Sequence, residues 1–219
     1  HVARLLQLVD VPAEAAQQQA QAVMALETRL AKASLSPVEL RKPENQYHFV
    51  SVAEADRLTP HFSWSAYLAA QGVDAKDGFS LSQPGFFAAL DTLLAEVPAA
   101  DWQAYLRYHA VEDAADYLAP AFAEESFAFY GKTLSGQPQM KPRWKRVLDS
   151  TNEALGMALG ELYVARAFSP EAKQRMNTLV QNLRLALKAR LEHLEWMSEA
   201  TRRQALAKWE TFLPKVGYP

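Results

Sequence analysis

The sequence predicts an all-α protein, with about ten helices arranged around a buried central helix and no substantial sheet. Three observations predict this class. Apolar residues recur at spacings of three and four along most of the chain, as they do on one face of a helix. Serine, proline and glutamate stand together at several of the expected helix starts. Only residues 77–83 have the composition of an extended strand, and they are too short to form a sheet by themselves.

The first two expected helices cover residues 1–9 and 13–33, and a proline lies between them. Ser36 begins a third start signal, because a serine cap is followed by a proline and a glutamate. Pro43 lies too close for a long helix to follow. We therefore expect residues 41–50 to form a loop that crosses the surface.

Five further helices are expected before a loop rich in glycine and proline at residues 131–142. They are a helix opened by the capping box of Ser51 and Glu54 that ends near Pro60, one over residues 64–71, one around Phe86 to Leu94, one over residues 99–119 and one that starts at Pro120.

Residues 143–168 form the expected central helix. Its apolar residues Leu148, Leu155, Leu159 and Leu162 follow the spacing of one buried helix face, and a second apolar line widens that face. Gly156 and Gly160 lie one turn apart, and each costs about 1 kcal/mol relative to alanine in a helix. That cost is explained if a neighbouring helix approaches the backbone closely at these glycines.

Two more helices complete the chain. The triplet Ser169-Pro170-Glu171 starts a long one, and Ser198 caps the last, over residues 199–212. We interpret residues 1–142 as the first part of a helical lobe and residues 143–219 as the central helix, long helix and interlobe connection of the same domain. A start inside a helix and an end just after one indicate that both ends are truncated.

Composition excludes several classes of function. The chain is 49% hydrophobic and 22% charged, as in proteins with a sizeable core. Its formal net charge of −2 gives no general attraction to nucleic acid or to anionic membranes. No run of about 18 apolar residues is present, so we expect no membrane contact from this segment. The absence of cysteine excludes disulfides and thiolate metal sites.

No residue of the chain is predicted to be catalytic or to bind a metal. None of the five histidines stands in H-E-x-x-H, the spacing that puts two imidazoles and a glutamate on one helix face. The most acidic cluster contains His109, Glu112, Asp113 and Asp116, whose spacing of four allows two pairs on helix faces. Such ligands suit a hard or borderline metal. A solvated helix face is the favoured interpretation of this cluster.

A short basic run surrounds Trp144, with Lys141 and Arg143 before it and Lys145 and Arg146 after it. One such run in an acidic chain is weak evidence for a nucleic-acid partner, and none is expected. We expect the basic side chains to neutralise helix ends and Trp144 to pack into the core.

Several short sequence phrases occur in order along nearly the whole chain, among them Ala25-Leu26-Glu27, Phe62-Ser63-Trp64, Gln83-Pro84 and Phe129-Tyr130-Gly131. In this order they resemble the neprilysin family of zinc metallopeptidases, which includes endothelin-converting enzyme and the bacterial oligopeptidases O. The residues that we assign as structural family motifs are Trp64, Arg143, Trp144, Gly156, Gly160, Tyr163, Trp196, Met197, Gly217, Tyr218 and Pro219.

The resemblance implies a parent enzyme that uses zinc and a chain that carries none of the zinc ligands. In this family the histidines and glutamate of H-E-x-x-H lie downstream of the Gly-Tyr-Pro phrase, as does a third ligand in an E-x-x-x-D motif. Glu112 and Asp116 match E-x-x-x-D literally but lack its context, so we interpret them as a decoy. The family's substrate-binding residues are not identified in this chain.

The resemblance further implies that the chain is the helical lobe that closes over the active-site cleft and encloses peptide substrates. Its partners would be the missing catalytic lobe of the same polypeptide and those peptides, and the chain alone would be inactive. The family is mostly extracytoplasmic in animals and in many bacteria, while some bacterial members are cytoplasmic, so the resemblance favours a periplasmic or secreted bacterial protein. The absence of cysteine fits a bacterial member better than the disulfide-rich animal ectodomains. Two alternatives remain: a self-sufficient helical module that binds a peptide or protein, and a metal-dependent enzyme built on the cluster from His109 to Asp116.

Overall fold

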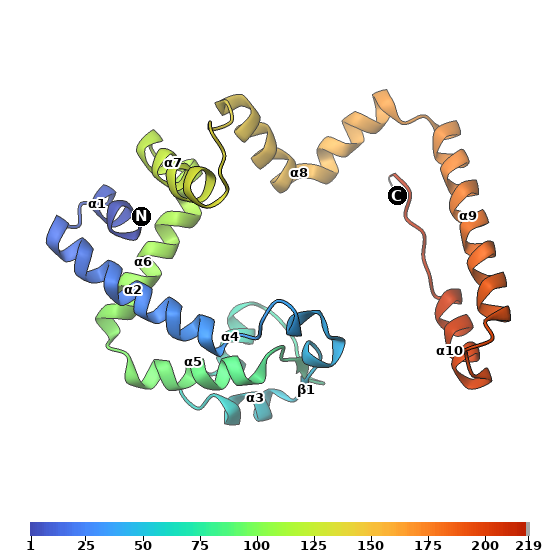
Figure 1. Cartoon of the computed structure of the whole chain (residues 1–219), viewed down its shortest axis with the longest axis horizontal. Coiled ribbons are helices and arrows are strands. Elements are labelled where there is room, and N and C mark those ends of the chain that lie inside the picture. The colour runs from blue at the N-terminus through green and yellow to red at the C-terminus, as the bar shows by residue number, and fades with distance from the viewer. Residues whose placement is uncertain (218–219) are drawn as a thin grey trace. The chain divides into compact units, whose positions relative to one another are not determined.

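The computed structural model describes residues 1–217 and divides into two compact units, His1–Met140 (unit 1) and Lys141–Pro219 (unit 2). Over the described residues it contains ten α-helices and a sheet of two short strands, which confirms the predicted all-α class (Figure 1). The motif residues Tyr218 and Pro219 lie outside the described residues.

The elements of unit 1 are, in order, α1 (Val2–Leu8), α2 (Ala13–Ala33), the 3-10 turns η1 (Glu39–Arg41) and η2 (Pro43–Asn45), β1 (Phe49–Val50), α3 (Val52–Leu58), α4 (Trp64–Ala70), β2 (Phe79–Ser80), α5 (Pro84–Glu96), α6 (Ala99–Ala114), the 3-10 turn η3 (Ala115–Tyr117), α7 (Pro120–Ser126) and the π-helix η4 (Phe127–Leu134). Those of unit 2 are α8 (Arg143–Ala167), α9 (Pro170–His193) and α10 (Glu199–Glu210).

The main core of unit 1 lies between α1, α2 and α6. Leu5 and Leu6 of α1 and Val23 of α2 are fully buried there, and Tyr108 of α6 is buried beside them. A second, smaller cluster surrounds Trp64, at the start of α4. Each cluster buries one face of the helices around it. Apolar residues spaced by three and four lie on such a face, so burial in the clusters stabilises these helices.

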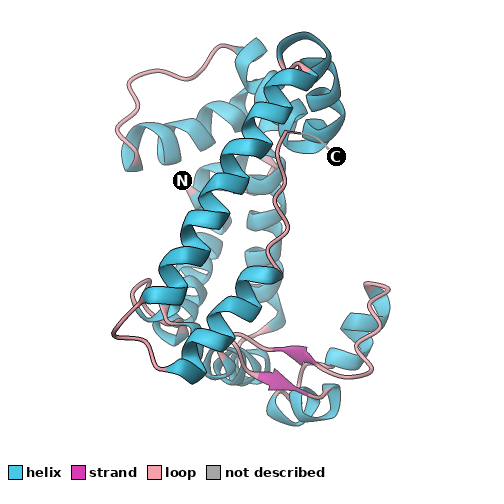
Figure 2. Ribbon diagram, turned by 90° about the vertical axis from the view of Figure 1, so that its right-hand side faces the viewer, coloured by secondary structure: helices cyan, strands magenta, loops and turns pink. Residues whose placement is uncertain are grey.

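The small sheet lies beside the second cluster. Strands β1 and β2 pair antiparallel, with Val50 opposite Phe79, and Figure 2 shows them side by side. The extended segment predicted at residues 77–83 therefore contains a strand, whereas the loop expected over residues 41–50 is wrong at its end. A strand of two residues has no alternating pattern to detect, and its partner lies about 30 residues further along the chain.

Predicted helix starts form through their caps. The side chain of Ser51 accepts the Glu54 N–H at 3.2 Å, and the Glu54 carboxylate accepts the Ser51 N–H at 2.7 Å. Ser36 and Glu39 make the same reciprocal bonds, but only the short turns η1 and η2 follow, because Pro43 interrupts a longer helix. At the other end of unit 1, η4 continues to Leu134, into the segment expected to be a loop.

Helix α8 covers the predicted central helix, but it is not buried. It bends at Leu155, whose backbone is non-helical (φ −127°, ψ 23°), and none of its residues is buried. The expected core position of Trp144 is also wrong, since 64% of this residue is exposed. The physical reason is that an apolar helix face predicts only that another element covers it. It does not predict that the covering element lies within the same 219 residues.

Helices α9 and α10 pack together in unit 2. Ser169 and Ser198 cap them, each accepting a backbone N–H three residues further on. The Trp209 indole N–H of α10 donates to the backbone carbonyl of Arg184 in α9 at 2.9 Å. Among the described residues, no helix combines the length and apolar character that crossing a bilayer requires.

Candidate functional site

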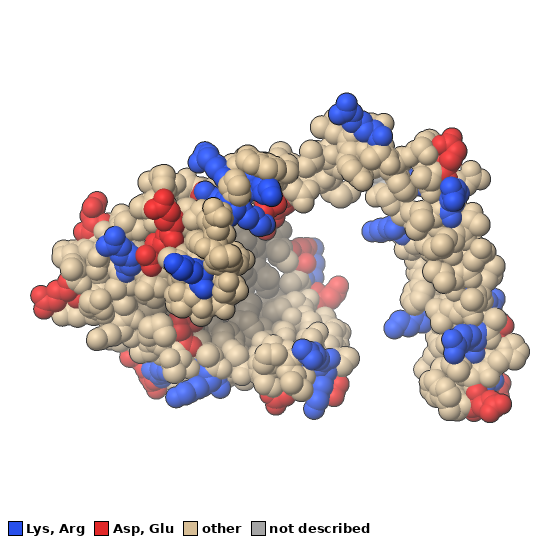
Figure 3. Space-filling model, turned by 45° about the horizontal axis from the view of Figure 1, so that its top comes forward, with Lys and Arg blue, Asp and Glu red and all other residues tan. Residues whose placement is uncertain are grey.

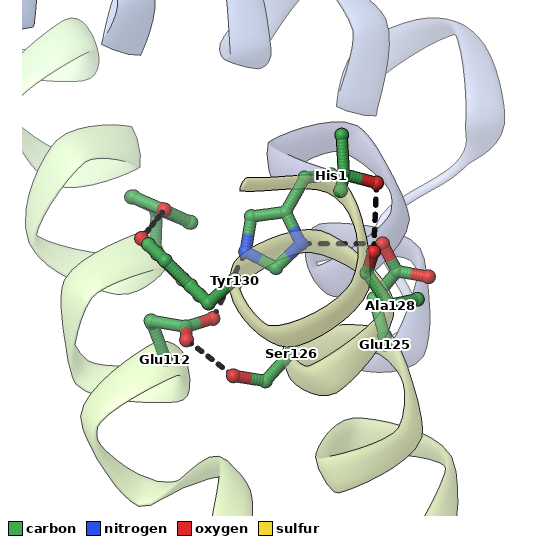
Figure 4. A network of polar contacts seen from close by, with 8 residues as sticks. His1, Glu112, Glu125, Ser126, Ala128 and Tyr130 are labelled. Carbon is green, nitrogen blue, oxygen red and sulfur yellow. Dashed lines mark hydrogen bonds and ion pairs between the residues drawn. The ribbon is translucent and has the colours of Figure 1, made fainter. Parts of the chain in front are cut away.

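The densest cluster of polar side chains lies in unit 1, around the imidazole of His1 (Figure 4). Its Nε2 lies 3.0 Å from a carboxylate oxygen of Glu112 in α6, and its Nδ1 lies 3.2 Å from one of Glu125 in α7. The other oxygen of Glu112 accepts the hydroxyl of Ser126 at 2.7 Å. The His1 side chain is only 4% exposed and stacks on Phe129, with ring centroids 4.4 Å apart.

This arrangement fixes the imidazole rather than presenting it for chemistry. Both ring nitrogens face carboxylate oxygens, so neither has a free lone pair for a metal or for a substrate proton. We interpret the cluster as a link between the start of α1 and helices α6 and α7. The sequence does not reveal this link, because His1 lies 111 and 124 residues from its partners.

Two tyrosines of α6 have raised pKa values. Burial, and next the 3.2 Å contact between its hydroxyl and that of Tyr130, raise the pKa of Tyr108 above its ordinary value. Burial, and next the negative charge of Glu27, raise the pKa of Tyr105. Both phenols therefore stay protonated over a wider pH range, and they act as hydrogen-bonding groups rather than bases.

The cluster proposed as an alternative metal site is not gathered in space. His109 turns to α2, where its Nε2 lies 2.8 Å from a carboxylate oxygen of Glu27, whereas Glu112 turns to His1. Asp116 lies in η3, beyond the end of α6. Over residues 1–217, no group of three or more His, Asp or Glu side chains is arranged to hold a metal ion. The described residues therefore do not fit a zinc site.

The family-motif residue of unit 1, Trp64, is a core residue. Its ring lies 5.2 Å from the ring of Phe79 and 5.1 Å from that of Phe87, measured between centroids. Its backbone N–H donates to the Asp56 carboxylate at 2.6 Å. These contacts tie α3, α4, β2 and α5 together, so the observed position of Trp64 is a structural one.

Five of the motif residues lie on α8, namely Arg143, Trp144, Gly156, Gly160 and Tyr163. The close approach of a neighbouring helix to the two glycines is not found. A Cβ on Gly160 would meet no described atom within 4 Å, and one on Gly156 would meet only the Asn152 side chain, at 3.7 Å. A groove of about 500 Å³ runs over these glycines, and Leu162 and Tyr163 line its side.

The remaining described motif residues lie at the turns of unit 2. Trp196 and Met197 lie in the turn between α9 and α10, which the Arg202 guanidinium holds by donating to the carbonyls of Leu194 (2.9 Å) and Met197 (3.3 Å). Gly217 has a φ of +70°, and a Cβ there would lie 2.5 Å from the ring of Phe168. Only glycine combines that backbone angle with so close a ring.

Charge is divided unequally between the two units. Residues 1–140 contain nine Lys and Arg against 17 Asp and Glu, a formal charge of −8, whereas residues 141–219 contain 14 against eight, a formal charge of +6. Lys and Arg side chains are prominent on the face of unit 2 that Figure 3 shows. The whole-chain charge of −2 hides this division.

A family model described as "Peptidase family M13" matches residues 1–219. The chain belongs to peptidase family M13. This family contains the zinc metallopeptidases of the resemblance, which is thereby confirmed. The match covers both units of the M13 chain, including the exposed helix α8.

The relatives of this M13 chain are longer than the chain. It is 29% identical over 221 residues to endothelin-converting enzyme-like 1 of Rattus norvegicus, covering 99% of this chain and 28% of that protein. It is also 36% identical in sequence to the Mycobacterium tuberculosis zinc metalloprotease whose crystal structure was solved in complex with an inhibitor. That match covers all of this chain and 33% of the metalloprotease chain, and its TM-score is 0.89. PepO from Lactobacillus rhamnosis has the same fold (TM-score 0.85, 22% identity, 100% and 34% coverage). The chain thus spans roughly a third of the length of these relatives.

Proposed function

We propose that the chain is the substrate-enclosing helical lobe of an M13 zinc endopeptidase that hydrolyses peptides, and that it is inactive alone. One observation carries the proposal. The family model matches every residue of a chain that is a third as long as its solved relatives and that has no H-E-x-x-H. We assign to this segment, which has the family's fold, a role in binding and enclosing the substrate.

The chemistry of the described side chains supports this division of roles. A catalytic zinc takes three protein ligands and keeps one position open for water. Zinc bound in the rest of the polypeptide would activate the water that attacks the peptide bond. In unit 1, both nitrogens of His1 are bonded, and His109 is paired with Glu27. We therefore assign no step of hydrolysis to residues 1–217.

The surface of unit 2 also supports a lobe that packs against more polypeptide. Large apolar side chains are exposed along α8 and α9, as on a core that has been cut open. They include Val147, Leu148, Leu155, Met157, Leu162, Leu179 and Leu183. The proposed partners of the chain are thus the catalytic lobe of the same polypeptide and the peptides that the two lobes enclose.

The proposal is tested by comparing the full-length polypeptide with the 219-residue chain. We expect the full-length protein to contain about one zinc ion and to hydrolyse a fluorogenic peptide, and the chain alone to do neither. The double variant Glu112→Gln with Asp116→Asn, made in the full-length protein, should leave the zinc content unchanged. Atomic absorption measures the zinc content, and cleavage of the fluorogenic peptide measures the activity.

Two results would contradict the proposal. Stoichiometric zinc in the isolated chain, lost in the double variant, would restore the cluster from His109 to Asp116 as a metal site. A full-length protein with neither zinc nor hydrolysis would instead favour the alternative of a helical module that binds a peptide or protein without enzymatic activity.

A further inference from the structure

Helix α9 has an apolar face that is distinct from the face that packs on α10. Leu179, Leu183 and Leu187 are spaced by four, so they form one line along the helix, and all three are exposed. A groove of about 640 Å³ runs along Leu179 and Leu183, and its lining is completed by Arg175, Thr178, Asn182 and Ala186. The face on α10 lies elsewhere on the helix, because Arg184 and Lys188 provide it.

The charges around the leucine line are all of one sign. Between residues 172 and 191 there are five basic residues and no acidic one. Arg175 precedes Leu179 by four residues and Arg190 follows Leu187 by three, so arginines flank the line at both ends. A partner that covers the line must therefore offer apolar side chains along its centre and carboxylates at its flanks.

We propose that this leucine face of α9 is the docking surface for an amphipathic α-helix with acidic flanks, which belongs to the part of the same polypeptide outside these 219 residues. This inference rests on the proposed function, in which the chain is one lobe of a longer enzyme. A line of side chains spaced by four is the ridge that packs into the groove of another helix. In the solved relatives the matching segment, with a TM-score of 0.89, is accompanied by about twice as much further polypeptide.

A second copy of the chain is a poorer occupant of the same face. A two-fold contact is made by the same patch on both subunits, which would bring the arginine-flanked face of one α9 against that of the other. Like charges at such a contact oppose association. A helix from the rest of the polypeptide meets no such restriction.

The matched pair Leu183→Glu and Leu185→Glu, made in the full-length protein, tests the face. Both leucines lie on α9 and are similarly exposed (62% and 52%), but they differ by two residues and so point to nearly opposite sides of the helix. Glutamate is a good helix former, so the helix itself is preserved. We expect Leu183→Glu to lower the Tm by about 5 °C and Leu185→Glu by less than about 1 °C. Equal shifts would overturn the inference.

A photo-crosslinking amino acid at position 183 of the full-length protein identifies the occupant, with position 185 as the control. We expect a crosslink from position 183 to an intramolecular segment outside the 219 residues that carries Asp or Glu beside apolar residues, and none to that segment from position 185. A crosslink to residues 1–140, to a second copy, or to no segment at all would overturn the inference.

The zinc content and peptidase activity of the unmodified full-length protein distinguish the two failures. If that protein binds zinc and cleaves peptides while position 183 behaves like position 185, only the docking surface is wrong. If the unmodified protein does neither, the proposed function is wrong, whatever the crosslinks show.

Discussion

The indole of Trp209 contacts Arg184 in two ways, through a hydrogen bond and through a cation–π contact. Its N–H donates to the Arg184 backbone carbonyl at 2.9 Å, and the Arg184 guanidinium lies over the ring, 4.8 Å from its centroid. The Lys188 ammonium lies over the same ring at 5.1 Å. One aromatic side chain of α10 therefore covers two consecutive turns of α9, which leaves the leucine face of α9 open.

Replacement of Trp209 should separate the hydrogen bond from the ring contacts. Trp209→Phe keeps an aromatic ring but removes the N–H, so the free energy of unfolding should fall by about 1 kcal/mol. Trp209→Ala removes both and should lower it by about 3 kcal/mol. Urea unfolding of the 219-residue chain, followed by circular dichroism, measures the change. Trp144→Phe is the control, since that exposed indole makes no comparable backbone bond and the change should stay below about 0.5 kcal/mol.

Gly217 and Gly72 form a matched pair with nearly the same backbone angle, φ +70° and φ +67°. Gly72→Ala should lower the free energy of unfolding by about 1 kcal/mol, the cost of a left-handed backbone for alanine, because a Cβ there meets no atom within 4 Å. Gly217→Ala should lower it further, because its Cβ would overlap the ring of Phe168. The same urea unfolding measures both. Equal losses would show that the ring moves aside without cost.

Glu112→Gln should destabilise unit 1 although it preserves the shape of the side chain. The amide no longer offers a charged acceptor to the buried His1 ring, and hydrogen bonds to charged groups are worth about 2 kcal/mol. We expect a loss of that size in the free energy of unfolding at pH 7. Glu124→Gln, on the exposed side of α7, serves as the control and should change stability by less than about 0.5 kcal/mol. A loss equal to that of the control would show that the contact between Glu112 and His1 does not stabilise unit 1.

Tyr108 should make the protein lose stability at alkaline pH. Its pKa is raised in the folded state by burial and then by Tyr130, so the folded protein holds the phenolic proton more tightly than the unfolded chain does. This contribution is complete below about pH 10 and falls as the pH rises further, because only the unfolded state then gains by ionising. Thermal unfolding between pH 8 and 11 should show a smaller alkaline loss for Tyr108→Phe than for the unmodified protein. Tyr117→Phe, a change at an exposed ring, should leave the loss unaltered.

Local signals in the sequence predicted most helix positions. The serine caps at Ser51, Ser169 and Ser198 each precede the helix that they predict, because a cap bonds a backbone N–H only three residues away. The ordered phrases along the chain were likewise sufficient for the resemblance that the family model confirms. The bend at Leu155 was not predicted, because it does not interrupt the apolar pattern. The π-helix that continues to Leu134 was not predicted, because the glycine and proline content of residues 131–142 indicated a loop.

The sequence by itself determined where the helices lie, how they are capped and which family the chain resembles, since these depend on neighbours within a few residues. Only the tertiary structure decided which faces are covered. It placed His1 between Glu112 and Glu125, paired β1 with β2, and left α8 and the leucine line of α9 exposed. The physical reason is that an apolar or charged side chain specifies the kind of partner it needs, whereas the identity of that partner depends on residues distant in the sequence or outside it.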